Sequence, residues 1–294
     1  MINDGAIHGM QPHLSLDFLP FKPEPSRVIH VENEGLYRRT EQSNSLDVTF
    51  FVACYNEEEN IVATLNTIVE TMKELPLTYE AVIVDDGSSD RSTELIMEYQ
   101  AQHPHVALVL VRNAFNCGLS RNFAEAAFLG RGRYYKLICG DNVDSKETLK
   151  TILAQAGKAD VVIPYHKNIV GRTWRRRLLS RSYTALVNLL SGQSLRYYNG
   201  CGLYRRADVM RWHSRTTGFG FQAELVTQLL SEGAAYIEVP TTALERENGS
   251  SSAMRLRNWI SVGCTLLNIF LCRLGSKRNS LRHGDKAEAL HKAA

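Results

Sequence analysis

From Asp47 to about residue 164, short apolar segments alternate with longer segments whose apolar residues recur at helical spacing. Few folds accommodate this pattern. The apolar segments predict buried strands over residues 48–53, 81–84, 106–111, 134–139 and 161–164. The intervening segments predict helices over residues 91–102, 119–130 and 145–156. Strands that alternate with helices form a mostly parallel sheet covered on both faces, so we expect an α/β fold with a central sheet flanked by helices.

A further helix is expected directly after the first strand. The side chain of Asn56 suits the N-cap position. Glu57, Glu58 and Glu59 would then lie in the first turn, where the helix dipole favours acidic residues. The apolar helical spacing continues from there to Met72.

The rest of the chain is less regular. Beyond residue 164 the pattern predicts helices over 174–190, 221–230 and 254–274, a short strand over 235–239 and a loop at 199–202. Residues 1–46 are polar and rich in proline, which predicts an irregular N-terminal extension. We therefore expect three parts: the extension 1–46, a main domain 47–252, and a C-terminal amphipathic helix with a polar tail, 253–294.

Charge and composition narrow the function classes. Apolar residues make up 44% and charged residues 22% of the 294 residues, as in an ordinary soluble domain, which excludes a disordered or fibrous chain. A net charge of +3 is too small to predict nucleic-acid binding, so no nucleic-acid partner is expected. Residues 160–220, however, hold eleven Lys and Arg against two Asp. This positive segment indicates an anionic ligand such as phosphate, although a solvated basic face is an alternative.

Cysteine spacing and hydropathy bear on location. The six cysteines form no C-x-x-C pair or zinc spacing, which predicts a reducing, cytoplasmic environment. The most apolar late stretch, 259–274, is interrupted by polar residues and is too short to span a bilayer. Peripheral contact with the cytoplasmic membrane face remains open.

Three common nucleotide and hydrolase motifs are absent. No G-x-G-x-x-G follows a predicted strand, no G-x-x-x-x-G-K-[ST] occurs, and no G-x-S-x-G occurs. What remains is a set of polar residues at strand ends: Tyr55-Asn56-Glu57, Asp85-Asp86 and Asp141. Because parallel strands end at the same edge of a sheet, we expect these three turns to form one ligand site.

Several segments, taken in order, resemble family 2 glycosyltransferases of the GT-A fold over residues 47 to about 260. The early ones are Ala53-Cys54-Tyr55-Asn56-Glu57-Glu58-Glu59-Asn60-Ile61, Val84-Asp85-Asp86-Gly87-Ser88-Ser89-Asp90, Asn116-Cys117-Gly118-Leu119-Ser120-Arg121-Asn122 and Gly140-Asp141-Asn142. The late ones are Phe219-Gly220-Phe221-Gln222-Ala223-Glu224, Glu238-Val239-Pro240 and Glu245-Arg246-Glu247-Asn248-Gly249-Ser250-Ser251. The late segments resemble the dolichol-phosphate mannose synthase branch, which glycosylates polyprenyl phosphate.

The resemblance implies a metal-dependent donor site. Gly140-Asp141-Asn142 stands where the family has its metal-binding D-x-D, so Asp141 is the expected ligand for Mg²⁺ or Mn²⁺. The first acidic position of that motif is Cys139 here, and a thiol is a poor ligand for a hard ion. Either Asp141 serves with water and diphosphate alone, or Asp144 assists. The alternative that needs no metal is that Asp141 merely caps the loop of the helix that begins at Ser145.

The resemblance also implies a nucleotide-binding set. One of Asp85 and Asp86 would accept a hydrogen bond from the base while the other holds the loop, Tyr55 would stack on the base, and Glu57 would meet the nucleotide. Each of these residues also has an alternative that needs no ligand. Asp85 and Asp86 would form an ordinary Asp-Gly turn, Tyr55 would be a half-buried aromatic, and Glu57 would be a helix-dipole partner. The full expected set is Ala53, Tyr55, Asn56, Glu57, Asp85, Asp86, Asn116, Gly140 and Asp141.

Residues near the acceptor are the least constrained. The resemblance places Glu224 near the acceptor and Arg246 beside a donor-gripping loop, so Asp141, Glu224 and Arg246 are the expected catalytic residues. Arg172 and Arg176 are candidate phosphate clamps, because guanidinium groups match phosphate oxygens. His166, predicted to end the fifth strand, and Ser251 complete the acceptor and phosphate set.

The sequence therefore predicts an inverting, metal-dependent glycosyltransferase. A nucleotide-diphospho-sugar, with UDP or GDP as its nucleotide, would be the donor, and a polyprenyl phosphate the acceptor. Two alternatives stay open: a transferase acting on a soluble or polysaccharide hydroxyl, and a non-catalytic nucleotide-sugar-binding protein on the same fold.

Overall fold

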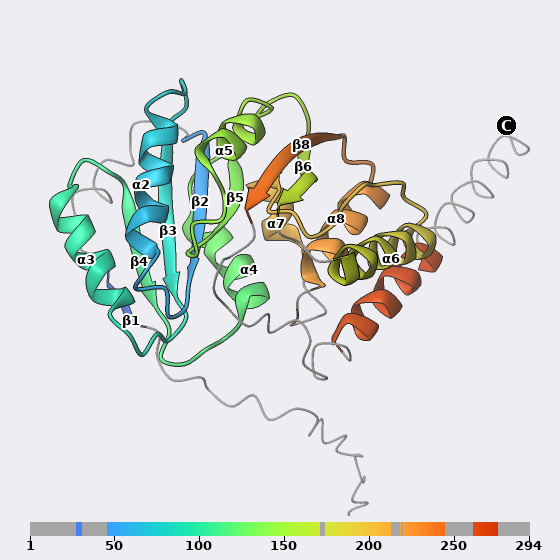
Figure 1. Cartoon of the computed structure of the whole chain (residues 1–294), viewed down its shortest axis with the longest axis horizontal. Helices are drawn as coiled ribbons and strands as arrows, with labels where there is room; N and C mark the ends of the chain where they lie inside the picture. Colours follow the sequence, from blue (N-terminus) through green and yellow to red (C-terminus); the bar gives the residue numbers. More distant parts are fainter. Residues whose placement is uncertain are drawn as a thin grey trace, which may run out of the picture.

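The structure, a computed structural model, describes residues 28–30, 46–170, 174–212, 218, 220–244 and 261–275. Within these ranges the chain forms one eight-stranded sheet of order β1-β4-β3-β2-β5-β7-β6-β8 (Figure 1). The strands are β1 (Val28–His30), β2 (Val48–Cys54), β3 (Tyr79–Asp85), β4 (Leu108–Arg112), β5 (Tyr134–Cys139), β6 (Val161–Val170), β7 (Leu203–Arg205) and β8 (Tyr236–Leu244). The four central strands β4, β3, β2 and β5 are parallel, as are β6 and β8. The predicted α/β fold with a mostly parallel sheet is confirmed.

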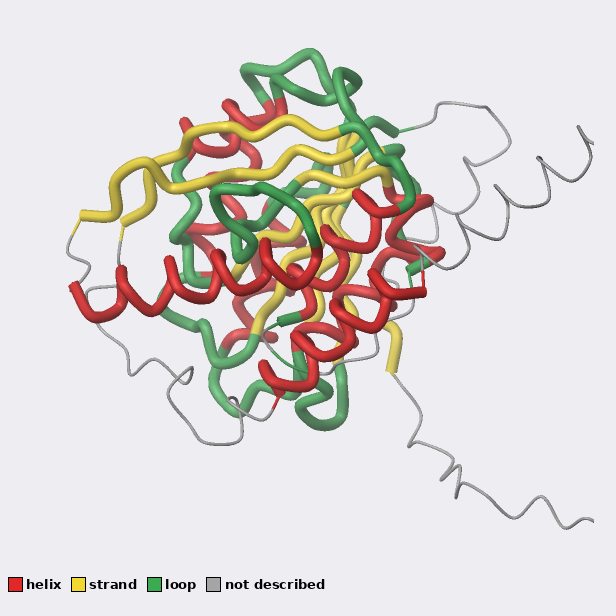
Figure 2. Tube along the Cα trace, turned by 90° about the vertical axis from the view of Figure 1, so that its right-hand side faces the viewer, coloured by secondary structure: helices red, strands yellow, loops and turns green. Residues whose placement is uncertain are grey.

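Helices cover both faces of this sheet (Figure 2). They are α2 (Ile61–Met72), α3 (Ser92–Gln102), α4 (Leu119–Leu129), α5 (Lys146–Leu153), α6 (Trp174–Ser191), α7 (Arg206–Arg211), α8 (Phe221–Ser231) and a helix over residues 261–275. One buried apolar cluster joins α2, α3 and α5 to one face, and a second joins α4, α6, α7, α8 and the 261–275 helix to the other. Phe50 and Phe51, neighbours on β2, belong to different clusters because successive side chains of a strand point to opposite faces.

Two local predictions are wrong. Asn56 does not cap α2, because its backbone is left-handed (φ 55°) and the helix begins at Ile61 with Asn60 as N-cap. The run Glu57–Glu59 therefore lies before the helix, whose first turn contains no acidic residue. His166 does not end a strand either, because β6 continues to Val170 in register with β8.

Other elements differ from the sequence pattern in smaller ways. The predicted irregular extension includes β1, which pairs antiparallel with β4. β7 and α7 were not predicted, since three and six residues are too few for a periodic signal. The predicted helix over 254–274 is described from residue 261 onward, and its first seven residues lie outside the described ranges.

Cysteine state and helix hydropathy complete the description. All six cysteines are free thiols. Within the described ranges, none of the helices combines the length and the apolar character that crossing a bilayer requires.

Candidate functional site

The turns after β2, β3, β4 and β5 lie together at one edge of the sheet. Cys54 pairs in register with Asp85, and Ala53 pairs with Cys139, so these strands end at the same level. Backbone hydrogen bonds continue the connection past the strands: the Asp86 amide donates to the Cys54 carbonyl, and the Gly140 amide to the Ala53 carbonyl, each at 2.8 Å. We call residues 55–57, 86–90, 113–118 and 140–142 the turn cluster. The sequence predicted that the Tyr55, Asp86 and Asp141 turns share an edge, and they do.

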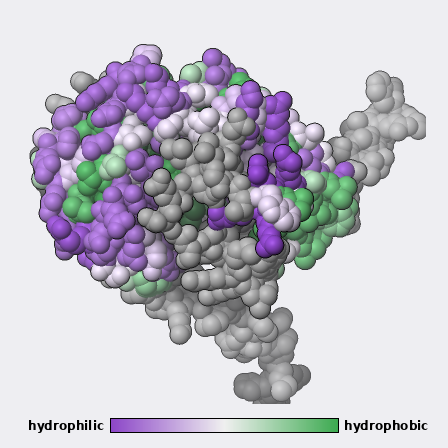
Figure 3. All heavy atoms as spheres, in the orientation of Figure 1, coloured by the Kyte–Doolittle hydropathy of each residue, from purple (hydrophilic) through white to green (hydrophobic). Residues whose placement is uncertain are grey.

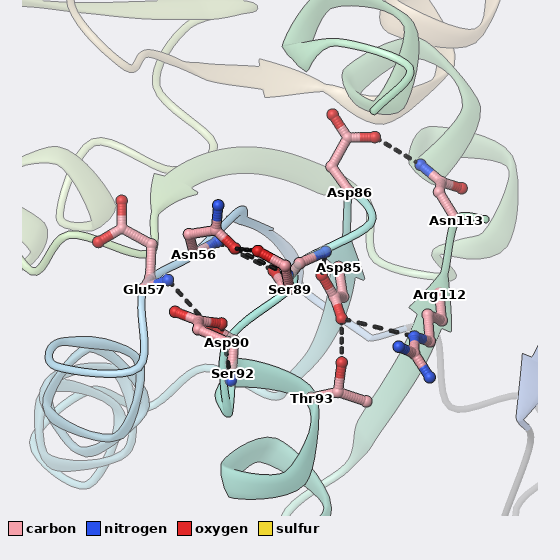
Figure 4. Close-up of polar contacts among 11 residues, drawn as sticks. Asn56, Glu57, Asp85, Asp86, Ser89, Asp90, Ser92, Thr93, Arg112 and Asn113 are labelled. Carbon is pink, nitrogen blue, oxygen red and sulfur yellow. Dashed lines mark hydrogen bonds and ion pairs between the residues drawn. The ribbon is translucent and has the colours of Figure 1, made fainter. Parts of the chain in front are cut away.

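Asn56 links the first two turns (Figure 4). Its amide donates to Ser88 Oγ at 2.9 Å, and its side-chain Oδ1 accepts from the Ser89 amide at 2.9 Å. The next amide, of Glu57, donates to Ser92 Oγ at 2.8 Å. Asn tolerates the left-handed backbone that this geometry requires better than most residues do. In the structure, Asn56 is thus a residue that holds two turns in place.

Asp85 is fully buried and engaged inside its own turn. Oδ1 accepts from the Ser88 amide at 2.9 Å, and Oδ2 accepts from the Thr93 hydroxyl. The Arg112 guanidinium Nε lies 4.0 Å from Oδ2 (Figure 4). Because both oxygens are occupied and the side chain has no exposed surface, Asp85 anchors the turn that presents Asp86.

Asp86 organises the loop after β4. Its Oδ1 accepts from Asn113 Nδ2 and from the Cys117 amide, each at 2.8 Å, and its Oδ2 accepts from the Gly118 amide at 2.9 Å. Asn113 Nδ2 also donates to Asn122 Oδ1 at 2.9 Å, which ties the loop to α4. A carboxylate oxygen accepts two hydrogen bonds readily, so Oδ2 retains capacity for one more donor.

Asn113 is a site residue that the sequence reasoning missed. It is buried, contacts Asp86 directly, and its Oδ1 has no hydrogen-bond partner in the structure. The predicted residue of this loop, Asn116, is instead exposed on the loop surface. The signal was available, because Asn113 is a polar residue that directly follows β4, at the same edge of the sheet that singled out Asp85 and Asp86.

The turns after β3 and β4 pack tightly against each other, and two aromatic side chains of the turn cluster remain exposed. A Cβ on Gly87, whose φ is +79°, would lie 3.0 Å from the Phe115 backbone, so only glycine fits there. Tyr55 is 49% exposed and Phe115 is 47% exposed. An aromatic ring with this much free surface on a polar rim can stack on a flat ligand.

The turn after β5 is fixed from α2. Thr64 Oγ1 donates to the Gly140 carbonyl at 2.9 Å, and Thr67 Oγ1 donates to Asn142 Oδ1 at 3.0 Å. A Cβ on Gly140 would lie 2.9 Å from the Ala53 carbonyl oxygen, so this turn lies directly against β2. Asn142, like Asn56, is left-handed (φ 53°).

Asp141 does not cap the following helix. Ser145 is the N-cap of α5, and its hydroxyl accepts from the Thr148 amide at 3.2 Å. Asp141 Oδ1 accepts from the Val143 amide at a long 3.4 Å. Ser145, and not Asp141, is therefore the N-cap of α5, and the Asp141 carboxylate lies in the turn cluster.

The cation fit depends on the neighbours of Asp141. Burial and a hydrogen bond with Cys201 raise the pKa of the Cys139 thiol, the hydrogen bond being the larger cause. A neutral thiol is a poor ligand for Mg²⁺ or Mn²⁺. Asp144 lies 3.6 Å from Nζ of the fully buried Lys136, so its carboxylate already balances a charge. Among the described residues no group of three His, Cys, Asp or Glu side chains forms a metal site. The residues present thus fit a cation held by Asp141 alone and otherwise by ligand oxygens and water.

Three of the predicted acceptor residues, Glu224, His166 and Arg176, lie within the described ranges, and they come from three different elements, α8, β6 and α6. Glu224 is buried on α8 and lines a cavity of about 260 Å³ with residues of α6 and the 261–275 helix, and none of the turn-cluster residues lines it. His166 Nδ1 lies 3.1 Å from Thr241 Oγ1, and its ring is 5.2 Å from that of Tyr197. Arg176 is exposed in the first turn of α6. Arg172, Arg246 and Ser251 lie outside the described residues.

Much of the positive segment is balanced within the fold. Arg205 lies 3.1 Å from Asp160 and 2.8 Å from Asp208, and Arg211 also pairs with Asp208. Arg206 donates to the carbonyls of Gly132 and Ala127. The exposed basic residues of this segment in the described structure include those of α6, together with Lys167 and Arg196.

Comparison with solved structures shows where this fold occurs. Glucosyl-3-phosphoglycerate synthase from Mycobacterium tuberculosis in complex with UDP matches with a TM-score of 0.57 at 15% identity, over 76% of this chain and 80% of that chain. Staphylococcus aureus TarS 1–349 in complex with UDP-GlcNAc gives 0.54 at 18% identity, over 79% and 72%. The mannosyltransferase PcManGT from Pyrobaculum calidifontis in complex with GDP-Man and Mn²⁺ gives 0.52 at 15% identity, over 84% and 81%. The fold is that of GT-A glycosyltransferases.

The sequence comparison is more specific than the fold. The model of the family "Glycosyl transferase family 2" matches residues 49–212, which is more than half of the chain and contains the whole turn cluster. The chain therefore belongs to glycosyl transferase family 2 and is a nucleotide-sugar glycosyltransferase.

Proposed function

We propose that the protein is an inverting, metal-dependent glycosyltransferase that moves a sugar from a UDP- or GDP-sugar to a polyprenyl phosphate. The proposed binding of the sugar-nucleotide donor rests on one observation, the turn cluster. There an exposed aromatic, a carboxylate with spare hydrogen-bond capacity and a second carboxylate share one edge of the sheet. The proposed polyprenyl-phosphate acceptor rests on the sequence resemblance to the dolichol-phosphate mannose synthase branch. A polyprenyl chain resides in a bilayer, so this acceptor requires peripheral contact with a membrane.

Each donor contact has a physical reason. Tyr55 stacks on the base with its exposed ring. Asp86 Oδ2, which accepts one hydrogen bond within the protein, accepts a second from a base N–H. Glu57 lies two residues after Tyr55 in the same turn and meets the nucleotide. Ala53, Asn56, Asp85 and Gly140 hold the turns, and Asn116 is positioned on the loop surface to meet the donor.

Asp141 is the proposed ligand for Mg²⁺ or Mn²⁺. When bound, such an ion neutralises negative charge on a diphosphate leaving group. The carboxylate oxygens of Asp141 match the preference of these ions for hard ligands, whereas the protonated Cys139 thiol does not. Asp144 stays with Lys136, because removing it would leave a buried charge without its partner.

The transfer is a single displacement. An acceptor phosphate oxygen forms a bond to the anomeric carbon as the bond to the donor diphosphate breaks, which inverts the configuration. An acceptor phosphate is already anionic and needs no general base, so Glu224 acts in this proposal by orientation. Arg172, Arg176 and Arg246 are the proposed phosphate contacts, with His166 and Ser251 beside them.

A hydroxyl acceptor is the second candidate, and one observation favours it. Glu224 is a buried carboxylate that lines a cavity, and a hydroxyl acceptor needs a carboxylate to remove its proton.

Transfer assays separate the two acceptor candidates. Purified protein with Mn²⁺ is offered UDP-glucose, UDP-GlcNAc or GDP-mannose together with a short polyprenyl phosphate or a hydroxyl glycan. We expect a glycolipid product of inverted configuration from one donor, and loss of turnover in Asp141→Ala but not in the surface control Glu94→Ala. Product only on the hydroxyl glycan selects the second candidate. Absence of both transfer and hydrolysis for every donor would overturn the proposal.

A further inference from the structure

Helix α6 turns apolar side chains away from the protein. Trp174, Leu178 and Leu189 recur at helical spacing on one side, where Leu189 is 71% exposed, and Leu179 and Leu186 extend that side. The opposite side, with Thr184 and Val187, packs on the core. A surface helix normally shows its polar side to water, so this reversed arrangement needs an explanation.

The helix over residues 261–275 repeats the arrangement. Thr265 and Ile269 are buried against the protein, while Leu267, Leu271 and Leu274 are exposed at intervals of four and three residues. Leu267 is 57% exposed. Phe270 lies on the same outer side as a fourth exposed apolar side chain.

The two helices form one surface. An Arg273 guanidinium nitrogen donates to the carbonyls of Leu189 and Leu190 at 2.7 and 3.2 Å, and Val187 and Ile269 belong to the same buried cluster. Figures 1 and 2 show the helices side by side as an outer layer at one end of the molecule, and apolar colour gathers at that end in Figure 3. We call the following set the apolar face: Trp174, Leu178, Leu179, Leu186, Leu189, Leu267, Phe270, Leu271 and Leu274.

Charge on these helices has one sign. Residues 174–191 and 261–275 contain five arginines and no Asp or Glu. Four of them, Arg175, Arg176, Arg177 and Arg181, are exposed on the N-terminal half of α6, and the Arg175 guanidinium lies 5.5 Å from the centroid of the Trp174 ring. A second copy of this chain would bring the same positive charge to the contact, whereas an anionic surface complements it.

We propose that the apolar face docks on a lipid bilayer that contains anionic phospholipid. The two helices lie in the plane of the interface with leucine, phenylalanine and tryptophan side chains among the acyl chains, and the arginines reach the phosphate headgroups. This docking would supply the membrane contact that the proposed lipid acceptor requires, and in that respect it rests on the proposed function. It is measurable without donor or acceptor, so its failure would leave the proposed donor site untouched.

Vesicle flotation tests the contribution of the apolar side chains to membrane binding. Wild-type protein should float with phosphatidylcholine vesicles that contain phosphatidylglycerol, and the variant Leu178→Gln/Leu189→Gln/Leu271→Gln should bind at least about tenfold more weakly. Phe128→Gln is the matched control, because Phe128 is 60% exposed on α4 and lies outside the apolar face. Equal binding by the triple variant and the wild type would overturn the proposal.

A second set of variants tests the charge. Arg175→Gln/Arg177→Gln/Arg181→Gln should weaken binding to the anionic vesicles and leave the weak binding to pure phosphatidylcholine unchanged, and high salt should mimic it. Arg176 is left intact, since it is a proposed acceptor contact. Anionic and neutral vesicles bound equally well by the wild type would contradict the assigned lipid class.

Two further measurements distinguish a loss of vesicle binding from misfolding and from self-association. Trp174 fluorescence should shift to shorter wavelength on anionic vesicles, and this shift should be lost in the mild variant Trp174→Phe. Light scattering of the wild type and the triple-leucine variant reports oligomeric state. A dimer that dissociates in the triple variant, with no binding of wild type to vesicles, would assign the apolar face to a second copy and overturn the membrane proposal.

Discussion

The Asp86 side chain accepts more hydrogen bonds within the turn cluster than any other side chain described above. Its three hydrogen bonds come from one side-chain amide and two backbone amides of the loop after β4. Hydrogen bonds to a charged group contribute about 1.5–3 kcal/mol each to stability when their loss leaves the partner unsatisfied. This makes Asp86 both a structural residue and, in the proposed function, a base contact.

We predict that Asp86→Asn lowers the free energy of unfolding by about 2–4 kcal/mol, because the new amide group would face the Cys117 and Gly118 amides with one oxygen in place of two. Urea unfolding followed by circular dichroism measures this. Glu94→Gln, an exposed change on α3, serves as the control and should stay within about 0.5 kcal/mol of the wild type. A stability of Asp86→Asn equal to that of the control would show that the loop does not depend on this carboxylate.

The cysteines should differ sharply in reactivity. Burial is the main cause that raises the pKa of Cys54 to about 12, and the pKa of Cys139 is raised as well, so neither forms the reactive thiolate near pH 8. Cys264 is exposed on the 261–275 helix. We expect Cys264 to react rapidly with a disulfide reagent in the native protein, and Cys54 and Cys139 to react only after unfolding. Mass mapping of labelled peptides checks this, and early labelling of Cys139 would contradict the environment described for it.

At the scale of the helices and strands, ion pairs between helices on the same face of the sheet supplement the packing of the apolar core. Glu74, just after α2, meets two lysines of α5: Lys150 Nζ lies 2.6 Å from Glu74 Oε2, and Lys146 pairs with Oε1. These hydrogen bonds, that of Lys146 first, lower the pKa of Glu74 from 4.5 to about 2. The charged form is therefore favoured in the folded protein.

The sign of the pH effect follows. A carboxyl group with a depressed folded-state pKa adds stability above its unfolded pKa and loses it as pH falls through the folded value. Between about pH 4.5 and pH 2, wild type should lose more stability than Glu74→Gln. The difference should be small because the groups are exposed, and 1 M salt should reduce it. Urea titrations at the two ends of this range measure it, and identical slopes for both proteins would refute the contact.

The elements that the sequence predicted best are those with long periodic signals. β2 to β5 and helices α3, α4 and α6 agree with the pattern to within a few residues, because buried strands and amphipathic helices have distinctive spacing. The start of α2 was wrong because the left-handed Asn56 bonds to Ser88 and Ser89, more than 30 residues away. The length of β6 was missed because its second half is stabilised by pairing with β8, which the local sequence does not report.

The site was predicted in outline and not in detail. Parallel strands place Tyr55, Asp86 and Asp141 at one edge by topology alone, which is why that prediction holds. The contact of Asp86 with Asn113 and the pairing of Lys136 with Asp144 are long-range or through-space, so spacing could not reveal them. The reversed exposure of α6 was equally hidden, since an apolar stripe at helical spacing does not say which side faces the core.

At the scale of the whole molecule, two regions divide the work. In the proposals made above, the turn cluster at the end of the four parallel strands binds the sugar nucleotide, and the apolar face of α6 and the 261–275 helix docks on the membrane. The fold links them through the second buried cluster, which runs from β2 and α4 to Val187 and Ile269. The donor site is the part on which the proposed function depends.

Thermal unfolding with nucleoside diphosphates tests that site most directly. UDP or GDP, at about 100 times its dissociation constant and with Mn²⁺ present, should raise the unfolding midpoint of the wild type by about 5 °C, and by less without Mn²⁺. Asp141→Asn should lose the Mn²⁺-dependent part of the increase. No increase with either nucleotide, or an unchanged Mn²⁺ effect in Asp141→Asn, would contradict the assignment of the turn cluster as the donor site.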